Sequence, residues 1–376
     1  MARVWDMLPE ARMVGGAVRD MLAGAAVMDV DFASPLAPEA VIRRARAAGL
    51  KAVPTGLAHG TVTVVAQGRP YEVTTLRRDV TTDGRHAVVA FTDDWEVDAS
   101  RRDFTINAMS AGRDGTVYDY FGGRADLAAG RVRFVGDARA RIAEDYLRIF
   151  RFFRFFARYG RGQPEAAALA AIAALRDGVG GLSAERVWSE LKRILLAPEP
   201  LTALELMQST GVLGLVIPGA DLAALAGLVA RGAPVDPLLR MAALLAADPK
   251  EFAERWRLSG AEAVLLAALR GDSHLAPGAE DADLRRALVR QPADVLIGQS
   301  WLRQDDRLGW QDLRARLAAM DRPVFPLRGR DLSGLGLAPG PEMGRALQAV
   351  EAWWLAGGCV AGRVACLEKA KQVLLF

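Results

Sequence analysis

Two short stretches near the N-terminus, Val14-Gly-Gly-Ala-Val-Arg-Asp20 and Met28-Asp-Val-Asp-Phe32, decide how the fold is predicted. The paired glycines allow the backbone to approach a polyphosphate closely, at the start of a predicted helix that ends near Gly24. On a strand, Asp29 and Asp31 would project to the same face. Two carboxylates so placed repel each other unless a cation lies between them, and hard oxygen ligands suit Mg²⁺.

Each of these features is weak when taken alone. An isolated Asp-x-Asp is typical of a loop or a solvated edge, and a Gly-Gly before a helix can be a simple tight turn. Glu72, on a second predicted strand, is either a surface residue or a third acid of the same site. Their order and spacing together favour a shared site.

The remainder of the chain divides into an α/β part and a helical part. Residues 61–66 and 71–76 are rich in β-branched side chains and are joined across residues 67–70, which predicts a hairpin. From about residue 136, Ala, Leu and Arg recur with a helical period. Helices are predicted over residues 38–49, 140–159, 165–176, 184–196, 200–211, 222–230, 237–247 and 341–356.

Composition narrows the class of protein. The 376 residues are 51% hydrophobic, which is enough for about two or three packed units. The formal net charge of +3 argues against a histone-like protein, but it conceals seven arginines against two acids in residues 139–161.

We expect a cytoplasmic protein without a membrane partner, because no apolar run is long enough to span a membrane and no leader pattern is present. Two cysteines and three histidines leave few ligands for zinc and make a disulfide framework unexpected.

Residues 14–31 resemble the signature of class II tRNA nucleotidyltransferases, a family of CCA-adding enzymes and bacterial poly(A) polymerases. Three more motifs follow in the family's order: Arg101-Arg-Asp-Phe-Thr-Ile-Asn-Ala-Met109, Glu144-Asp-Tyr-Leu-Arg148 and Glu185-Arg-Val-Trp188. The motifs cover about residues 15–195, and beyond residue 200 the resemblance is loose.

The resemblance implies an α+β fold. A polymerase β-like nucleotidyltransferase head at residues 1–135 would precede a helical neck at 136–200 and a helical body and tail at 201–376 that binds tRNA. The reaction implied is attack of a tRNA 3′-hydroxyl on the α-phosphate of CTP or ATP, with release of pyrophosphate. A two-metal Mg²⁺ mechanism is expected.

The resemblance also suggests roles for individual residues. Asp29 and Asp31 would bind metal and act in catalysis together with Glu72. The residues expected to bind the nucleotide are Gly15, Gly16, Arg19, Arg102, Asp103, Asp145, Arg148, Arg151 and Arg154. Asp103 would bind the ribose 2′-hydroxyl, although it can equally cap the helix that follows.

In the resembled family, Asp145 and Arg148 act as a protein template that reads the edge of the base. The alternative is a structural Asp–Arg pair at i and i+3 of one helix. A helical wheel places Arg148, Arg151, Arg154 and Arg158 on one side. The apolar side, which we expect to be core, holds Ile149, Phe150, Phe152, Phe153 and Phe156.

Other activities remain open on these residues. Poly(A) polymerase and enzymes that add only CC or only A belong to the same class, and the segment Asp83-Gly-Arg-His86 favours full CCA addition over CC-only addition. An inactive RNA-binding homologue is a further alternative, as is transfer to a protein or a small molecule. The intact acids and the Asp145/Arg148 pair argue against these last two.

Overall fold

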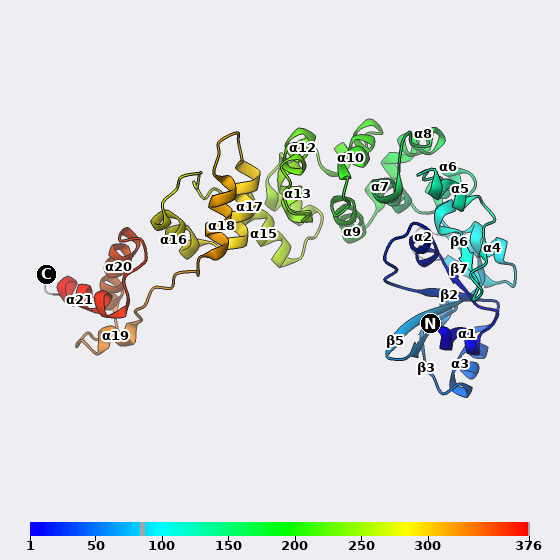
Figure 1. Cartoon of the computed structure of the whole chain (residues 1–376), viewed down its shortest axis with the longest axis horizontal. Coiled ribbons are helices and arrows are strands. Elements are labelled where there is room, and N and C mark those ends of the chain that lie inside the picture. Colours follow the sequence, from blue (N-terminus) through cyan, green and yellow to red (C-terminus); the bar gives the residue numbers. More distant parts are fainter. Residues whose placement is uncertain (83–86, 375–376) are drawn as a thin grey trace. The chain divides into compact units, whose positions relative to one another are not determined.

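The structure is a computed structural model that describes residues 1–82 and 87–374 of the chain. The chain divides into two compact units, Met1–Leu222 and Ala223–Phe376. Both predicted domain boundaries, after residues 135 and 200, fall within the first unit, and that finer division stays a prediction. Among the described residues no strand follows Tyr118, so the predicted change from an α/β part to a helical part is confirmed (Figure 1).

A seven-stranded sheet forms the base of the first unit, with the strand order β3-β4-β5-β2-β1-β8-β9. Its strands are β1 (Arg12–Val14), β2 (Asp31–Ser34), β3 (Lys51–Gly56), β4 (Thr61–Ala66), β5 (Arg69–Thr75), β8 (Ser110–Ala111) and β9 (Val117–Tyr118). β6 (Arg77–Thr82) and β7 (Ala87–Phe91) pair in a second sheet. The predicted hairpin is confirmed, because β4 and β5 are antiparallel and pair as far as Ala66 and Arg69.

The sheet has one apolar face and one face that carries acids. Helices α1 (Ala2–Met7), α2 (Gly16–Leu22) and α3 (Pro38–Ala47) share a hydrophobic core with Phe32 and Val73 of the sheet. Because side chains alternate along a strand, Asp31 and Glu72 project from the opposite face. β2 and β5 run parallel with Asp31 directly beside Glu72, so long-range pairing brings the two acids together.

Helices make up the remainder of the first unit. They are α4 (Trp95–Ser100), α5 (Gly123–Ala128), α6 (Ala138–Glu144), α7 (Leu147–Tyr159), α8 (Ala166–Leu175), α9 (Ala184–Leu195), α10 (Pro200–Ser209) and α11 (Val212–Val216), with α12 (Leu222–Ala230) crossing into the second unit. Short 3₁₀ turns lie at Leu57–His59, Thr105–Asn107 and Arg176–Gly181.

The predicted single helix over residues 140–159 is wrong. The chain leaves helical geometry at Asp145 and begins α7 at Leu147. The carboxylate of Asp145 accepts the backbone N–H of Leu147 at 3.0 Å, a local bond that competes with continuation of the helix. Asp145 therefore lies at a corner between two helices.

The apolar side of α7 is the core that the helical wheel predicts. Ile149, Phe150, Phe152, Phe153 and Phe156 are all buried. Phe152 stacks on Phe134 at 6.0 Å between ring centroids, and Phe134 lies 4.7 Å from Phe104. These rings hold α7 against the segment that follows the sheet.

The second unit is helical throughout its regular elements. They are α13 (Pro237–Leu244), α14 (Pro249–Arg255), α15 (Gly260–Arg270), α16 (Asp281–Arg290), α17 (Ala293–Arg303), α18 (Trp310–Ala319), α19 (Gly329–Ser333), α20 (Pro341–Ala356) and α21 (Arg363–Leu374). Cys359 and Cys366 are free and buried in the core of α19 to α21. Among the described residues, no helix is both long and apolar enough to span a membrane.

Replacing Phe152 by alanine should destabilise the first unit by about 3–5 kcal/mol, because the cavity lies in a close-packed aromatic cluster. Calorimetric melting of the full chain measures the loss, and Phe152→Leu, which keeps more of the volume, should lose less. Equal melting temperatures for Phe152→Ala and the unaltered chain would show that the cluster does not hold α7.

Candidate active site

Gly15 is a glycine for two reasons that the structure makes visible. Its φ of +66° lies in the left-handed region, and a Cβ there would lie 2.8 Å from Nη1 of Arg102. The residue caps the N-terminus of α2, and Gly16 begins that helix. The turn therefore brings backbone, helix start and the Arg102 guanidinium together, as expected for a site that receives phosphate.

The acids predicted to bind metal lie beside this turn. Asp29 and Asp31 both line the same pocket as Gly15 and Gly16. The prediction that both aspartates lie on one strand is wrong, because β2 begins at Asp31 and residues 25–30 form no regular element. Glu72 does not line the pocket. It lies directly beside Asp31, because the two residues are paired on neighbouring strands.

The charges at this edge repel one another. The pKa of Asp31 is raised, first by loss of hydration and then by the negative charges of Glu72 and Asp29, against the opposing effect of Arg102. Such a cluster is at its most favourable when a cation is bound. Among the described residues no group of three His, Cys, Asp or Glu side chains is arranged to hold a metal. Two carboxylates nevertheless fit Mg²⁺, which commonly takes one or two protein carboxylates and completes its shell with water and substrate phosphates.

Arg102 and Asp103 occupy different positions despite being neighbours in sequence. Arg102 lies beside Gly15 at the pocket and pairs with Asp98 at 3.5 Å, while burial lowers its pKa. Asp103 is 7% exposed and accepts hydrogen bonds from Asn107 at 2.9 Å and from Arg151 at 2.6 Å. Burial by itself would raise the pKa of Asp103, but the charge of Arg151 and the bond from Asn107 lower it below its usual value.

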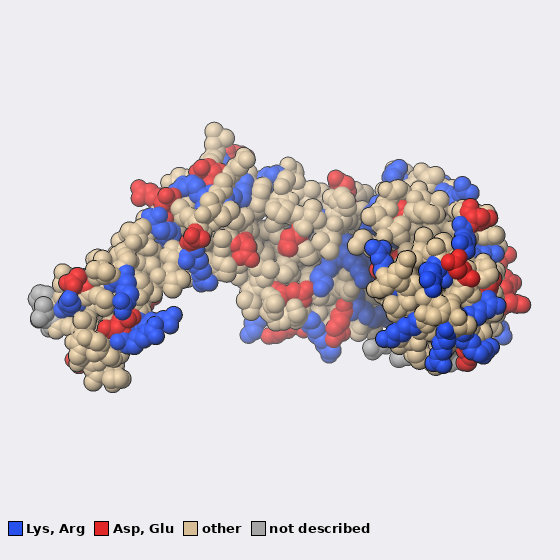
Figure 2. Space-filling view, turned by 60° about the horizontal axis from the view of Figure 1, so that its bottom comes forward, with Lys and Arg blue, Asp and Glu red and all other residues tan. Residues whose placement is uncertain are grey.

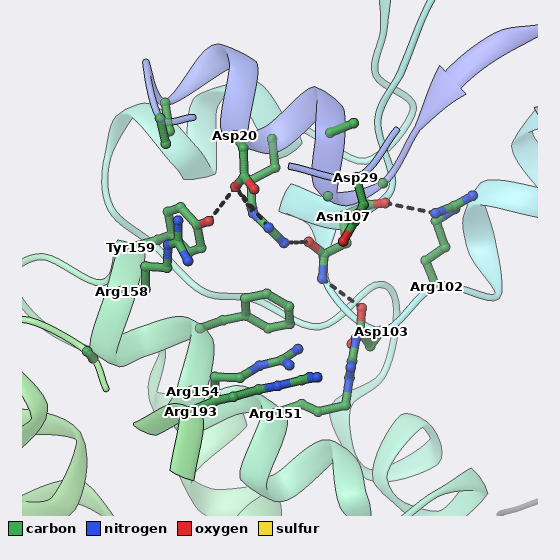
Figure 3. A pocket seen from close by; sticks show the side chains of 18 of the residues that line it. Asp20, Asp29, Arg102, Asp103, Asn107, Arg151, Arg154, Arg158, Tyr159 and Arg193 are labelled. Carbon is green, nitrogen blue, oxygen red and sulfur yellow. Dashed lines mark hydrogen bonds and ion pairs between the residues drawn. The ribbon is translucent and has the colours of Figure 1, made fainter. Parts of the chain in front are cut away.

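The opposite wall of the pocket is the arginine side of α7. The pocket has a volume of about 1270 Å³. It is lined by the four arginines that the helical wheel places on one side of the helix: Arg148, Arg151, Arg154 and Arg158. Loss of hydration lowers the pKa of Arg154 to about 10, against the opposing charge of Glu190. Figure 3 shows Arg151, Arg154 and Arg158 on one side of the pocket, with Asp20 and Asn107 facing them.

Asp145 and Arg148 both line the pocket, each with a different partner. Asp145 pairs with Arg186 at 2.7 Å, whereas Arg148 pairs with Glu144 and donates to the carbonyl of Arg141 at 2.8 Å. The alternative of a structural Asp145–Arg148 pair therefore finds no support among the described contacts. The backbone N–H of Arg148 donates to the carbonyl of Asp145 at 3.0 Å, while separate ion pairs fix the two side chains at the pocket.

The pocket is strongly basic, although the whole chain is nearly neutral. Among the described residues, ten arginines and five aspartates line it. Elsewhere charge is mixed: on the face of the molecule that Figure 2 draws, basic side chains are interspersed with acidic ones. An excess of arginine around a small acidic edge suits a ligand with several negative charges and a bound cation.

Several pocket residues are missing from the predicted site. Asp20, Asn107 and Tyr159 line the pocket. Asp20 and Asn107 accept hydrogen bonds from the predicted residue Arg19, and Tyr159 donates to Asp20. Arg186 and Arg193 come from α9. The quoted motifs contain Asp20, Asn107 and Arg186, so membership of a motif could have predicted that they lie at the site. No sequence pattern indicates Tyr159.

Two known protein families match parts of this chain. The family described as the poly A polymerase head domain matches residues 11–133. The family described as the probable RNA and SrmB-binding site of polymerase A matches residues 163–223. The first match contains the acidic edge and the Gly15 turn, and the second contains α9.

Relatives match over most of the chain. The mitochondrial CCA tRNA nucleotidyltransferase 1 of Danio rerio is 39% identical over 361 residues, covering 92% of this chain and 83% of the relative. The CCA-adding enzyme of Levilactobacillus brevis is 31% identical over 365 residues, covering 91% and 88%. The crystal structure of the Bacillus stearothermophilus CCA-adding enzyme in complex with CTP has a TM-score of 0.76 and 25% identity, covering 99% of this chain and 96% of that chain.

The fold and the matches define a nucleotidyltransferase with an α/β head and a helical remainder, as the motifs predict. The chain belongs to the family of CCA-adding tRNA nucleotidyltransferases. The roles assigned above to individual side chains stay predictions.

Replacing Asp31 by asparagine should stabilise the metal-free chain near neutral pH. A raised pKa means that the folded chain binds this proton more tightly than the unfolded chain, so the stability from neutral Asp31 is present at low pH and is lost as the pH rises through the raised pKa. Like charges on paired strands cost about 0.2–1 kcal/mol, and solvent screening places this exposed pair near the lower end.

Chemical unfolding in the presence of a chelator, at several pH values, measures this gain. Asp114→Asn, on the same unit but outside the pocket, is the control and should not reproduce it. A less stable Asp31→Asn chain at neutral pH would contradict the repulsive cluster.

Proposed function

We propose that this chain adds C, C and A to the 3′ ends of tRNA from CTP and ATP, without a nucleic-acid template, and releases pyrophosphate. The observation that carries the proposal is the pocket in which the acidic edge at Asp29 and Asp31 faces the arginine side of α7. The names of the relatives that match over most of the chain support the same reaction.

The triphosphate fits against the Gly15–Gly16 turn. Gly16 presents a backbone without a side chain, while Arg102 lies beside Gly15 and Arg19 beside Gly16, and both supply positive charge. Asp29 and Asp31 are the residues that would hold Mg²⁺, with Glu72 adding a third negative charge beside Asp31. Bound Mg²⁺ would supply activation of the attacking hydroxyl and charge stabilisation on the leaving oxygens.

The base fits at the junction of α6 and α7. Asp145 offers acceptors and Arg148 offers donors, and complementary groups of this kind can read the hydrogen-bonding edge of a base. Arg186 and Glu144 pair with these two side chains, so their orientation is set before a ligand binds. Asp103 is the residue that we propose for the ribose 2′-hydroxyl. Phe104, Asn107 and Arg151 donate to its two oxygens, just as Leu147 and Arg186 donate to those of Asp145.

We further propose that the helices of residues 201–376 bind tRNA and that the enzyme works in the cytoplasm. The second of these rests on the sequence alone. The segment 83–86, which favours full CCA addition, lies outside the described residues. Poly(A) polymerase is kept as a second candidate, because both matching families are described by that activity.

Primer extension on tRNA that lacks its CCA end, with each nucleoside triphosphate singly and together, tests the proposal. We expect C, C and A to be added and then addition to stop. Long tails made from ATP alone would establish the poly(A) alternative instead.

The double variant Asp29→Asn with Asp31→Asn should lose about three orders of magnitude or more in incorporation, because it removes the groups proposed to bind the cation. Binding of tRNA, measured by filter retention, should survive. Asp114→Asn is the matched control and should stay active. Full incorporation by the double variant would refute the metal assignment.

Arg148→Ala should reduce the preference for CTP over UTP by about tenfold or more, since a good bidentate contact to a base contributes about 1–3 kcal/mol of discrimination. Competition between the two triphosphates in primer extension measures the preference. Arg139→Ala, an exposed arginine of α6 outside this pocket, is the control. Unchanged selection by Arg148→Ala would remove Arg148 from the template.

A further inference from the structure

Tyr159, the last residue of α7, is hydrogen bonded to the beginning of the chain. Its hydroxyl donates to Oδ1 of Asp20 on α2, across 139 positions of sequence. The same oxygen accepts Nε of Arg19 at 2.9 Å. Arg19 then donates through Nη1 to the side-chain oxygen of Asn107 at 2.6 Å. The carboxylate of Asp20 therefore accepts hydrogen bonds both from Tyr159 of α7 and from Arg19, the arginine predicted to contact the nucleotide.

The series of hydrogen bonds continues back to α7. Asn107 donates to Asp103 at 2.9 Å, and Arg151 of α7 donates to the other oxygen of Asp103 at 2.6 Å. Figure 3 shows these dashed contacts running from Tyr159 through Asp20 and Asn107 to Asp103. The series of hydrogen bonds therefore begins at Tyr159 of α7 and ends at Arg151 of the same helix, about two turns away.

The guanidinium of Arg19 is held on its faces as well as its edges. Its Cζ lies 4.7 Å from the ring centroid of Tyr159 and 4.9 Å from that of Phe155. Arg19 is only 8% exposed, and a Cβ on Gly16 would lie 3.4 Å from its Nη2. A buried cation stacked on two rings, beside the glycine turn, cannot reorient freely.

The donors of Arg19 are only partly used. A guanidinium has five N–H donors, and Nε, Nη1 and Nη2 each direct one of them to Asp20 or Asn107. Arg19 lines the pocket with its Nη2 beside Gly16, and the remaining N–H groups of Nη1 and Nη2 are the donors left for a ligand there. Their direction is set by the carboxylate of Asp20, and that carboxylate is in turn held by the hydroxyl of Tyr159.

We propose that Asp20 and Tyr159 are positioning residues that aim the Arg19 guanidinium at the phosphates of the incoming nucleotide, whichever base it carries. This inference rests on the proposed function, because it assumes that the pocket binds nucleoside triphosphates. It separates two tasks in one pocket: the Asp20–Tyr159 contact sets affinity for the phosphates, and Asp145 with Arg148 sets the choice of base.

A purely structural contact makes a different prediction. If Tyr159 only held α7 to α2, its loss would lower stability and leave nucleotide affinity unchanged once the chain is folded. Phenylalanine at this position keeps the ring under Arg19 and removes only the hydroxyl. The burial of Tyr159 and its bond to Asp20 raise the pKa of the phenol, so that it remains a donor near neutral pH.

The experiment compares Tyr159→Phe, Asp20→Asn and the unaltered chain in primer extension at fixed tRNA. The lost hydrogen bond acts on the nucleotide only through Arg19, so the effect is smaller than the full loss of a hydrogen bond to a charged group. The KM for CTP and for ATP should rise by the same factor, about three- to tenfold. The kcat should change by less than about twofold, as expected when binding is lost equally from ground and transition states. Competition between CTP and UTP should be unchanged.

Asp20→Asn should have the larger effect on KM, and the double variant should be no worse than Asp20→Asn alone, because both act through one contact. The matched control is Tyr120→Phe, which removes a hydroxyl that accepts a hydrogen bond from Arg12 at 3.3 Å, outside the pocket. Its KM values should equal those of the unaltered chain.

Calorimetric titration with a non-reactive CTP analogue, without tRNA, keeps this inference distinct from the proposed function. Weaker binding by Tyr159→Phe supports the positioning role even if no CCA addition were found, in which case only the proposed function fails. Unchanged affinity and KM in a folded Tyr159→Phe chain overturn the inference, as does a change confined to one nucleotide.

Discussion

The carboxylate of Asp103 is the contact on which the geometry of the pocket depends. It is almost fully buried, and it binds the backbone N–H of Phe104 at 3.0 Å on one side and Arg151 of α7 on the other. Removing one partner of a buried ion pair typically costs about 3–5 kcal/mol, because the remaining charge is left without compensation. Asp103 and Arg151 must therefore stay together, and α7 is fixed against the sheet-bearing part of the chain.

Once α7 is fixed, the acidic residues of the sheet face the arginine side of α7. The sheet carries its acids at Asp31 and Glu72 on the face that α1 to α3 leave uncovered. The helix carries arginines on the side away from its phenylalanine core. A triphosphate needs both, since its phosphates are anionic and its reaction needs a cation held by carboxylates.

Local patterns predicted what is local in the structure. Alternating β-branched residues predicted β4, and the helical period separated the buried phenylalanines of α7 from its arginines. The break at Asp145 was missed because the apolar period continues across it, while the side-chain bond to Leu147 has no periodic signature. The parallel register of Asp31 with Glu72 and the contact of Tyr159 with Asp20 join distant parts of the chain, so only the motifs, and no local pattern, could indicate such proximity.

The most direct test of the account is a crystal structure of this chain with CTP and Mn²⁺, which replaces Mg²⁺ and is visible by anomalous scattering. We predict Mn²⁺ at Asp29 and Asp31, phosphates against Gly16 and Arg19, and the cytosine edge at Asp145 and Arg148. Mn²⁺ bound away from both aspartates, or CTP outside this pocket, would contradict the assignment of the site.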